Sequence, residues 1–308
     1  MKNRRAVIVV SLLIVALSAY PMTSFIELSA GGGWSSLGYQ LDARSMPTLS
    51  ASQSGSYGYG AHIGYGLLFN QYVGIGIGAD FTRYGANAKL SGRAVWQDVT
   101  DTEGEQYSHI TTVRRWADQQ ALFYLEIPLS LYIRFPVSDN SAVYAQLGAK
   151  ACIPMMSKAH YAGELTHAGS YEPWMMEINE VPNHGFYSSV MDQDYPFKSR
   201  FGAAGFVKIG FEGAVDSDDR VWLYGAVYGT MFFTSALDGN ASGRPLGWRN
   251  DTNDSEQYEA HAFMSDYSPL YTTVLATGKG MPMAVGAEIG VRFKIPHPKH
   301  HRCMCYQW

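Results

Sequence analysis

The sequence predicts an all-β fold: an eight-stranded antiparallel transmembrane β-barrel with four long extracellular loops and short periplasmic turns. Three observations lead to this prediction. Eight segments alternate apolar with polar or small residues, the connections between them alternate long and short, and 32 Gly, 21 Tyr and 14 Phe accompany only 16% charged residues. An even number of such strands with short turns at one end is typical of barrels that cross the bacterial outer membrane.

The final segment, from Met283 to Ile295, shows the alternation most clearly. One face carries Met, Val, Ala, Ile, Val, Phe and Ile, whereas the other carries Ala, Gly, Glu, Gly, Arg and Lys. In a soluble β-sandwich, which is the alternative fold, the apolar face would be the core. In a barrel the apolar face meets lipid and the charged face lines the lumen. The long polar connections favour the barrel, because structureless loops of that length are uncommon in a compact soluble domain.

The predicted strands cover residues 24–35, 57–69, 72–84, 121–135, 142–153, 201–214, 221–233 and 283–295. Each is long enough for a tilted strand to cross the hydrocarbon layer, which takes about 9–11 residues. Asn70-Gln71, Ser138 to Ser141, and Asp216 to Asp219 are the predicted short turns, since Asn, Asp and Ser favour turns. The other four connections are long and polar, so we expect loops there.

Sequence features divide the chain into three parts: a secretory signal peptide at 1–19, the barrel at 24–295 and a periplasmic tail at 296–308. The first part joins basic residues to an apolar run from Ala6 to Leu17 and then to small residues. This run is too short to span a bilayer as a helix, although a short membrane anchor is the alternative. The sequence after this run contains no stretch of eighteen consecutive apolar residues, so it predicts no transmembrane helix.

The C-terminal tail contains side chains that often bind metals, namely His300, His301, Cys303 and Cys305. Their spacing does not match that of structural zinc sites. We therefore expect a disordered periplasmic tail and no metal.

Charged residues with the parity of the lumen face are the candidate site. An eight-stranded barrel has an interior that side chains fill, and an unpaired charge there is costly, so opposite charges are expected to pair. We expect a salt-bridge plug, and a gated ion path through the same pairs is the alternative. Lys294 shares this parity, and Cys152 is expected to be a free, inert thiol on the same face. The predicted lumen charge network is Asp80, Glu126, Arg134, Lys150, Lys208, Glu212, Glu288 and Arg292.

Catalytic and nucleic-acid-binding signals are weak. Most histidines, including His109, His160 and His167, fall in predicted loops, and His62 lies on the second strand. His184, Ser188, Ser189 and Asp192 match no catalytic spacing. The net charge of −4 comes without a basic stripe. We therefore predict no catalytic residues, no cofactor and no nucleic-acid partner.

The fourth predicted strand, Tyr124-Leu-Glu-Ile-Pro-Leu-Ser-Leu-Tyr-Ile-Arg-Phe135, resembles the pattern Y-L-E-I-P-L-L-L-K-Y-R-F of the PorT-like family of outer-membrane β-barrel domains. The final Gly-Val-Arg-Phe strand also fits that family. The resemblance implies an eight-stranded barrel in the bacterial outer membrane, related in shape to the OmpA and OmpX barrels. The loops here are longer than in a minimal member, and we expect no peptidoglycan-binding domain after the barrel.

The expected function is a structural or surface-interaction role, in which the long loops of a monomer in outer-membrane lipid contact an extracellular protein or glycan. A narrow channel or a component of a secretion machine is the first alternative. A lipid-modifying enzyme with its site at the barrel rim is the second.

Overall fold

The computed structural model describes residues 22–42, 48–100, 104–171, 176–181, 186–237, 270 and 276–295. The predicted signal peptide, the predicted tail with Cys303 and Cys305, and His184 lie outside the described residues. No helix in the described part of the chain is long and apolar enough to cross a membrane.

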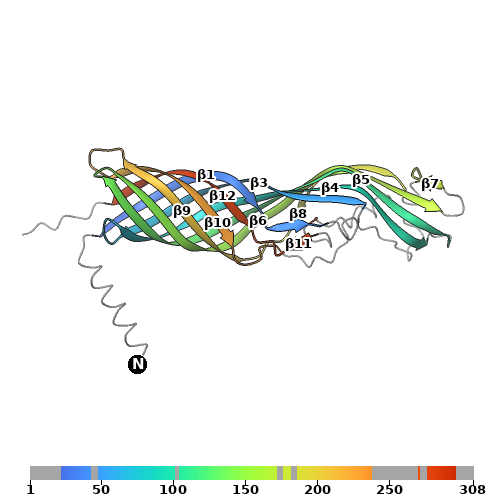
Figure 1. Ribbon diagram of the computed structural model, residues 1–308, viewed down its shortest axis with the longest axis horizontal. Coiled ribbons are helices and arrows are strands. Elements are labelled where there is room, and N and C mark those ends of the chain that lie inside the picture. The colour runs from blue at the N-terminus through green and yellow to red at the C-terminus, as the bar shows by residue number, and fades with distance from the viewer. Residues whose placement is uncertain are drawn as a thin grey trace, which may run out of the picture.

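Eight long strands form a closed antiparallel ring, which confirms the predicted barrel (Figure 1). Around the ring, β1 pairs with β3, β3 with β4, β4 with β5, β5 with β6, β6 with β9, β9 with β10, β10 with β12, and β12 with β1. The strands are β1 (Thr23–Ser36), β3 (Leu49–Leu68), β4 (Val73–Thr100), β5 (Gln106–Ser138), β6 (Ser141–Tyr171), β9 (Gly202–Ala214), β10 (Val221–Phe232) and β12 (Met283–Ile295).

The three predicted short turns all lie at one end of the barrel, together with the start of β1 and the end of β12, where Ser24 pairs with Ile295. In the turns, side chains supply hydrogen-bond acceptors for backbone N–H groups that have no partner on a neighbouring strand. Asn70 Oδ1 accepts hydrogen bonds from the backbone N–H groups of Tyr72 and Val73, each at 2.8 Å. Short turns face the periplasm in barrels of this type, so the opposite end is extracellular.

The barrel carries its apolar side chains on the outside. Ile127, Val207 and Ile289 are 42%, 44% and 70% exposed, while Glu126, which precedes Ile127 on β5, is fully buried. A soluble sandwich would bury the first group and expose the second, so that alternative is wrong. Each strand contributes to this apolar belt, for example through Leu28, Ile63, Ile77, Leu129, Leu147, Ile209, Val227 and Ile289.

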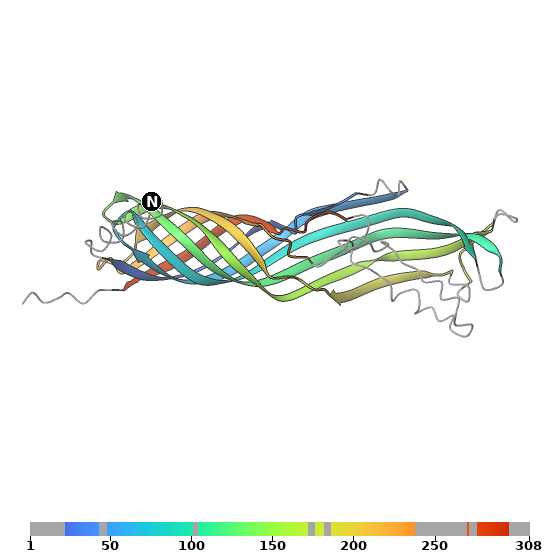
Figure 2. The same cartoon turned by 90° about the horizontal axis from the view of Figure 1, so that it is seen from below.

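Two of the four regions predicted to be long loops, those after residues 84 and 153, consist mostly of strands instead. β4 and β5 continue pairing as far as Thr100 and Gln106, and β6 continues to Tyr171. Two further strands, β7 (Met176–Ile178) and β8 (Ser188–Pro196), pair with β6 beyond the barrel. Figures 1 and 2 show these strands running far past the barrel as one long sheet. We call this sheet the extension; it comprises residues 49–55, 86–100, 106–120 and 157–171 with β7 and β8.

The extension has a hydrophobic core of its own, unlike the structureless loops that we expected. Its inner face buries Leu90, Val113, Trp116 and Tyr161, and the Trp116 and Tyr161 rings stack with centroids 5.4 Å apart. Leu270, from a distant part of the chain, is buried in the same core. The sheet is therefore an ordered element held by packing.

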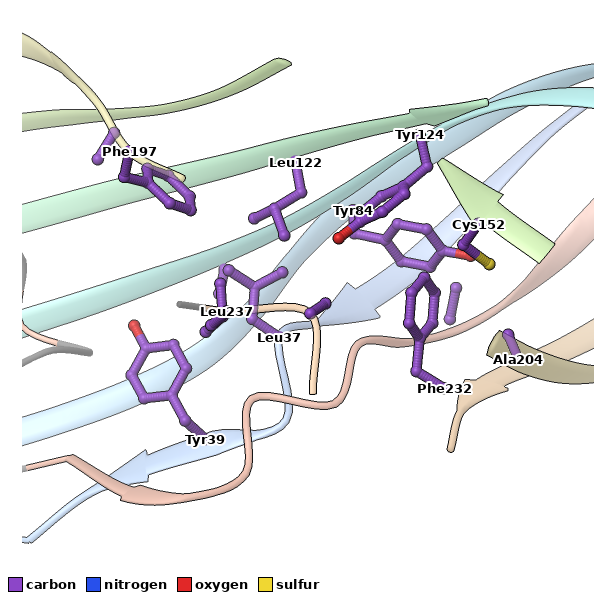
Figure 3. Close-up of a cluster of buried hydrophobic side chains, with 14 residues drawn as sticks. Leu37, Tyr39, Tyr84, Leu122, Tyr124, Cys152, Phe197, Ala204, Phe232 and Leu237 are labelled. Carbon is purple, nitrogen blue, oxygen red and sulfur yellow. The ribbon is translucent and has the colours of Figure 1, made fainter. Parts of the chain in front are cut away.

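A small second sheet lies at the extracellular mouth, where β2 (Tyr39–Leu41) pairs with β11 (Ala276–Gly278). The sharp entry to β2 requires glycine at position 38, where φ is +69° and a Cβ atom would meet the Met281 backbone oxygen. The neighbouring side chains form a buried mouth cluster, shown in Figure 3 and made of Leu37, Tyr39, Tyr84, Leu122, Tyr124, Phe197, Phe232 and Leu237.

Candidate functional site

The inward-facing charges form a continuous chain of alternating sign, here called the lumen charge chain. It begins near the periplasmic end, where Arg134 and Arg292 both form ion pairs with Glu212. Arg292 Nε also lies 2.9 Å from Glu27 Oε2. Glu212 thus lies between two cations, which compensates for removing its charge from water.

The chain continues through His62 toward the extracellular mouth. His62 Nε2 lies 3.0 Å from Glu27 Oε1, and its Nδ1 contacts Asp80. Lys150 Nζ then lies 2.7 Å from both Asp80 Oδ2 and Glu126 Oε2. In order, the chain is Arg134, Glu212, Arg292, Glu27, His62, Asp80, Lys150 and Glu126.

The guanidinium of Arg292 is enclosed by aromatic rings as well as by carboxylates. The centroids of Phe25, Tyr132, Tyr144 and Tyr224 lie 4.3–5.4 Å from its Cζ atom. Glycine on β12 makes room for one of these rings, since a Cβ atom at Gly290 would lie 2.5 Å from Tyr224. Cation–π contacts of this kind add stability to a desolvated charge.

All eight charged residues of the predicted network lie on the inner face, and six of them belong to the lumen charge chain. The other two form a separate pair, in which Lys208 Nζ lies 2.9 Å from each Glu288 carboxylate oxygen. Lys294 instead pairs with Asp219 at the periplasmic end, at 2.7 Å. Cys152 is buried and free, with Sγ 4.0 Å from Glu126 Oε1.

Sequence reasoning missed two members of the chain, Glu27 and His62. The alternation of side chains along each strand assigns both residues to the inner face. Glu27 alternates with Ile26 and Leu28, which are each 41% exposed on the lipid face. His62 alternates in the same way with Ile63, which is 55% exposed.

The lumen is filled along its length and covered at its mouth. Tyr84 packs edge-on against Phe232 within the mouth cluster (Figure 3). Its hydroxyl donates a hydrogen bond of 2.6 Å to Glu126, so the mouth cluster directly contacts the charge chain. One cavity of about 40 Å³ lies beside His62, between Lys150 and Lys208. That volume holds a few water molecules at most, since one water needs about 10–15 Å³ on this measure.

Most side chains on the outer face of the extension are polar or small. Paired positions on neighbouring strands place residues in rows across the sheet, because paired side chains point to the same side. One row consists of Ser52, Lys89, Ala117, Ala162 and Asp192. The adjacent row consists of Ser54, Asn87, Gln119, His160 and Asp194. We call these ten residues the row face.

Three histidines expected in loops, His109, His160 and His167, lie on strands instead. His109 and His167 face each other inside the extension, with Nε2 of the first 3.2 Å from Nδ1 of the second. Burial lowers the pKa of His109 to about 3 and that of His167 to about 4. His160 lies on the row face, where its ring nitrogens approach Asp192 and Asp194 at 3.3 and 2.9 Å.

Side chains suited to catalysis or metal binding do not gather elsewhere in the described residues. Ser188, Ser189 and Asp192 lie along β8, with no histidine hydrogen bond to either serine in the described part of the chain. Among the described residues no group of three or more His, Cys, Asp or Glu side chains is arranged to hold a metal ion.

No protein-family model and no curated protein sequence matches the chain. Solved structures to which this chain is similar include neisserial surface protein A, at 12% identity over 90% of this chain and 100% of that one, with a TM-score of 0.35. Outer membrane protein OprG from Pseudomonas aeruginosa is 11% identical over 89% and 97%, with a TM-score of 0.35. The attachment invasion locus protein Ail of Yersinia pestis, in complex with the heparin analogue sucrose octasulfate, is 9% identical over 88% and 99%, with a TM-score of 0.32.

This chain's own closed ring and exposed apolar belt establish its class. A ring of eight strands with charges sealed inside and aliphatic side chains outside has no stable placement in water, whereas it suits a bilayer. The chain is an eight-stranded transmembrane β-barrel of the bacterial outer-membrane type.

Proposed function

We propose that this chain is a surface-interaction protein of the bacterial outer membrane, which binds an extracellular protein or glycan through the row face of its extension. The observation that carries the proposal is the contrast between a filled barrel and an ordered sheet that projects from it. The barrel offers no open passage among its described residues, whereas the extension presents a broad polar surface.

The chemistry of the row face supports a polar partner. Its side chains are hydroxyl, amide, carboxylate, imidazole and ammonium groups, interspersed with Ala117 and Ala162. Adjacent rows of a sheet repeat regularly, and neighbouring strands lie about 4.8 Å apart, so donors and acceptors form a regular array. Such an array suits the hydroxyl groups of a glycan or the polar rim of a protein.

The core behind the row face supports the same proposal. Because Leu90, Trp116 and Tyr161 pack on the inner side, the outer side chains stand on a rigid support. A partner then loses less free energy to ordering than it would on a mobile loop.

The test is binding of the full-length protein in lipid nanodiscs to immobilised collagen, fibronectin, laminin and a glycan array. Ala162→Trp places a large ring within the row face, between Ala117 and Asp192, and is expected to reduce binding at least tenfold. Ala149→Trp makes the same change on the lipid-facing side of the same strand and should leave binding unchanged. Absence of any binding, or equal loss in both variants, would contradict the proposal.

The narrow channel or secretion-machinery component remains the alternative, and the charge chain is the feature that favours it. Planar bilayers distinguish the two. We expect no stepwise conductance from the wild-type protein, since the charge chain and mouth cluster fill the lumen. Conductance that changes in Glu126→Gln or Arg134→Met would favour the channel. Membership of the PorT-like family is likewise a proposal, supported by the resemblance of the strand around Tyr124.

A further inference from the structure

His62 occupies the centre of the lumen charge chain, and both of its ring nitrogens face carboxylates. Nε2 lies 3.0 Å from Glu27 Oε1, and Nδ1 contacts Asp80 Oδ1. An ionised carboxylate only accepts hydrogen bonds, so each of the two ring nitrogens has to carry a proton. A neutral imidazole has one N–H group and would turn a lone pair toward one carboxylate. The geometry therefore requires the imidazolium form.

The carboxylates around His62 are themselves held in the ionised form by other donors. Glu27 also accepts from Arg292 Nε at 2.9 Å, and Asp80 lies 2.7 Å from Lys150 Nζ. At the far end of the chain, Glu126 accepts from Lys150 and from the Tyr84 hydroxyl. Every carboxylate next to His62 thus has a second cationic partner, which leaves no carboxyl proton to substitute for the one on the imidazole.

A charge count over the lumen gives the same result independently. Among the described residues, the barrel interior holds four permanent cations, Arg134, Lys150, Lys208 and Arg292. The same described part of the interior holds five carboxylates, Glu27, Asp80, Glu126, Glu212 and Glu288. Four positive and five negative charges leave one negative charge, and a protonated His62 makes the total zero. Buried charge that is not compensated costs several kcal/mol, so this single proton matters to the whole interior.

The backbone is shaped to hold the imidazole in this position. A Cβ atom at Gly64 would lie 2.5 Å from His62 Nε2, and one at Gly78 would lie 2.6 Å from His62 Cε1. Both glycines flank the ring, one on its own strand and one on β4. A larger residue at either position would displace the imidazole from its two carboxylates.

We propose that His62 is a buried proton-binding site whose single proton neutralises the lumen and keeps the barrel closed. This role is separate from ligand binding at the row face. The titratable groups that face His62 or its adjacent cavity are Glu27 on β1, Asp80 and Tyr84 on β4, Lys150 on β6, Lys208 on β9, Tyr228 on β10 and Glu288 on β12.

The sign of the pH dependence follows from the charge count. The protonated imidazole contributes its full stabilisation at the acidic end of a range in which the carboxylates are ionised. As the pH rises through the titration of His62 in the folded barrel, the lumen gains one uncompensated negative charge. The barrel then loses stability. Water in the cavity beside His62 hydrates the excess charge.

The test uses the full chain folded in phosphatidylcholine vesicles, with the unfolding midpoint read from heat-modifiable gel mobility between pH 6 and pH 10. His62→Gln removes the cation and is expected to lower the midpoint at pH 7 by roughly 5 °C or more, and to flatten the pH dependence of the wild type. His62→Gln with Asp80→Asn restores a neutral lumen, with Lys150 still paired to Glu126. This double variant should recover at least half of the lost midpoint and stay independent of pH.

His160 provides the matched control, since it also contacts two carboxylates but lies on the exposed row face. His160→Gln should leave the midpoint and its pH dependence unchanged. A double variant no more stable than His62→Gln would overturn the proposal, because charge balance would then not be the cause. If His62→Gln does not fold, ¹⁵N NMR of the wild-type imidazole decides: two protonated ring nitrogens at pH 7 support the proposal, and a neutral tautomer refutes it.

Discussion

The barrel and the extension share four strands, β3 to β6, but distribute their side chains in opposite ways. On β5, the inner face carries Glu126 and Arg134 within the barrel, and Trp116 within the extension. The outer face carries Leu129 within the barrel and Gln119 within the extension. The inner face is continuous along the strand, so the backbone does not cause the change. The surrounding solvent does, since the barrel meets lipid and the extension meets water.

The change occurs over a few residues at the mouth of the barrel. Leu122 points inward into the mouth cluster, and Phe123 next to it lies on the outer face, stacked at 5.9 Å on Phe81. Both faces are apolar at this level. A single strand can thus pass from membrane to water if a short zone that is apolar on both faces separates the two patterns.

Removing one buried carboxylate is expected to give the largest effect, and it tests whether the barrel depends on ionic packing. Glu212 is shared by Arg134 and Arg292. Glu212→Gln should lower the free energy of unfolding by about 3–5 kcal/mol, because it leaves buried cations under-compensated. Urea unfolding in vesicles measures this.

The control for that prediction is an exposed pair in the extension. Glu164 pairs with Arg115, whose side chain is 82% exposed. Glu164→Gln should cost about 1 kcal/mol or less. Equal losses in the two variants would mean that the barrel and the extension use charge in the same way.

A Leu→Ala substitution should cost much more stability in the core of the extension than on the lipid-facing side of the barrel. Leu90 is 1% exposed inside the extension, whereas Leu129 is 62% exposed on the lipid face. Leu90→Ala should destabilise the extension by about 2–5 kcal/mol, because it leaves a cavity. Leu129→Ala should cost about 1 kcal/mol or less, since lipid fills the space. Limited proteolysis of the extension and heat-modifiable mobility of the barrel report the two effects separately, and a barrel weakened by Leu90→Ala would refute their independence.

A charge introduced on the outer face should distinguish lipid from water. Ile289 on β12 and Val190 on β8 are 70% and 79% exposed. Ile289→Arg should cost about 2–4 kcal/mol, because it places a guanidinium at mid-membrane depth. Val190→Arg should change the free energy of unfolding by no more than about 0.5 kcal/mol. Equal tolerance of the two changes, measured by denaturant unfolding in vesicles, would argue against a lipid-facing β12.

The smallest expected effect is acid sensitivity confined to the extension. Burial lowers the pKa of His109 to about 3 and that of His167 to about 4, from an ordinary value of 6.5. The unfolded state therefore binds more protons below pH 6.5, so the stabilisation is complete above that pH and declines as the pH falls toward 4. Amide hydrogen exchange near His109, corrected for intrinsic rates, should be faster at pH 4.5 than at pH 7.5. The His109→Gln/His167→Gln double variant should lose this difference, and its persistence would point to other groups.

The sequence allowed the barrel to be predicted because lipid imposes a strong alternation on every strand. The extension was missed since its pattern is weaker: β4 there alternates small residues such as Ala88 and Ala94 with polar ones. Its core also depends on Leu270, which is far away in the chain. Local periodicity could not reveal a core that distant segments complete.

The sequence predicts which charged residues face the lumen, but it does not predict which of them form ion pairs with one another. Parity alone assigned residues such as Glu126 and Lys150 to the inner face. Which charges meet depends on how far neighbouring strands are offset around the ring, and no local pattern contains that offset. A list of formal charges omits His62, because histidine counts as neutral at pH 7, although its alternation with Ile63 assigns it to the lumen.

Continuity of β4, β5 and β6 from the barrel into the extension has a mechanical consequence. A partner that pulls on the tip loads these strands along their own axes, so the force reaches the barrel wall through many hydrogen bonds in parallel. The ladder has to shear as a whole instead of opening one bond at a time. The projecting sheet is thereby anchored against traction in a way that a flexible tether would not be.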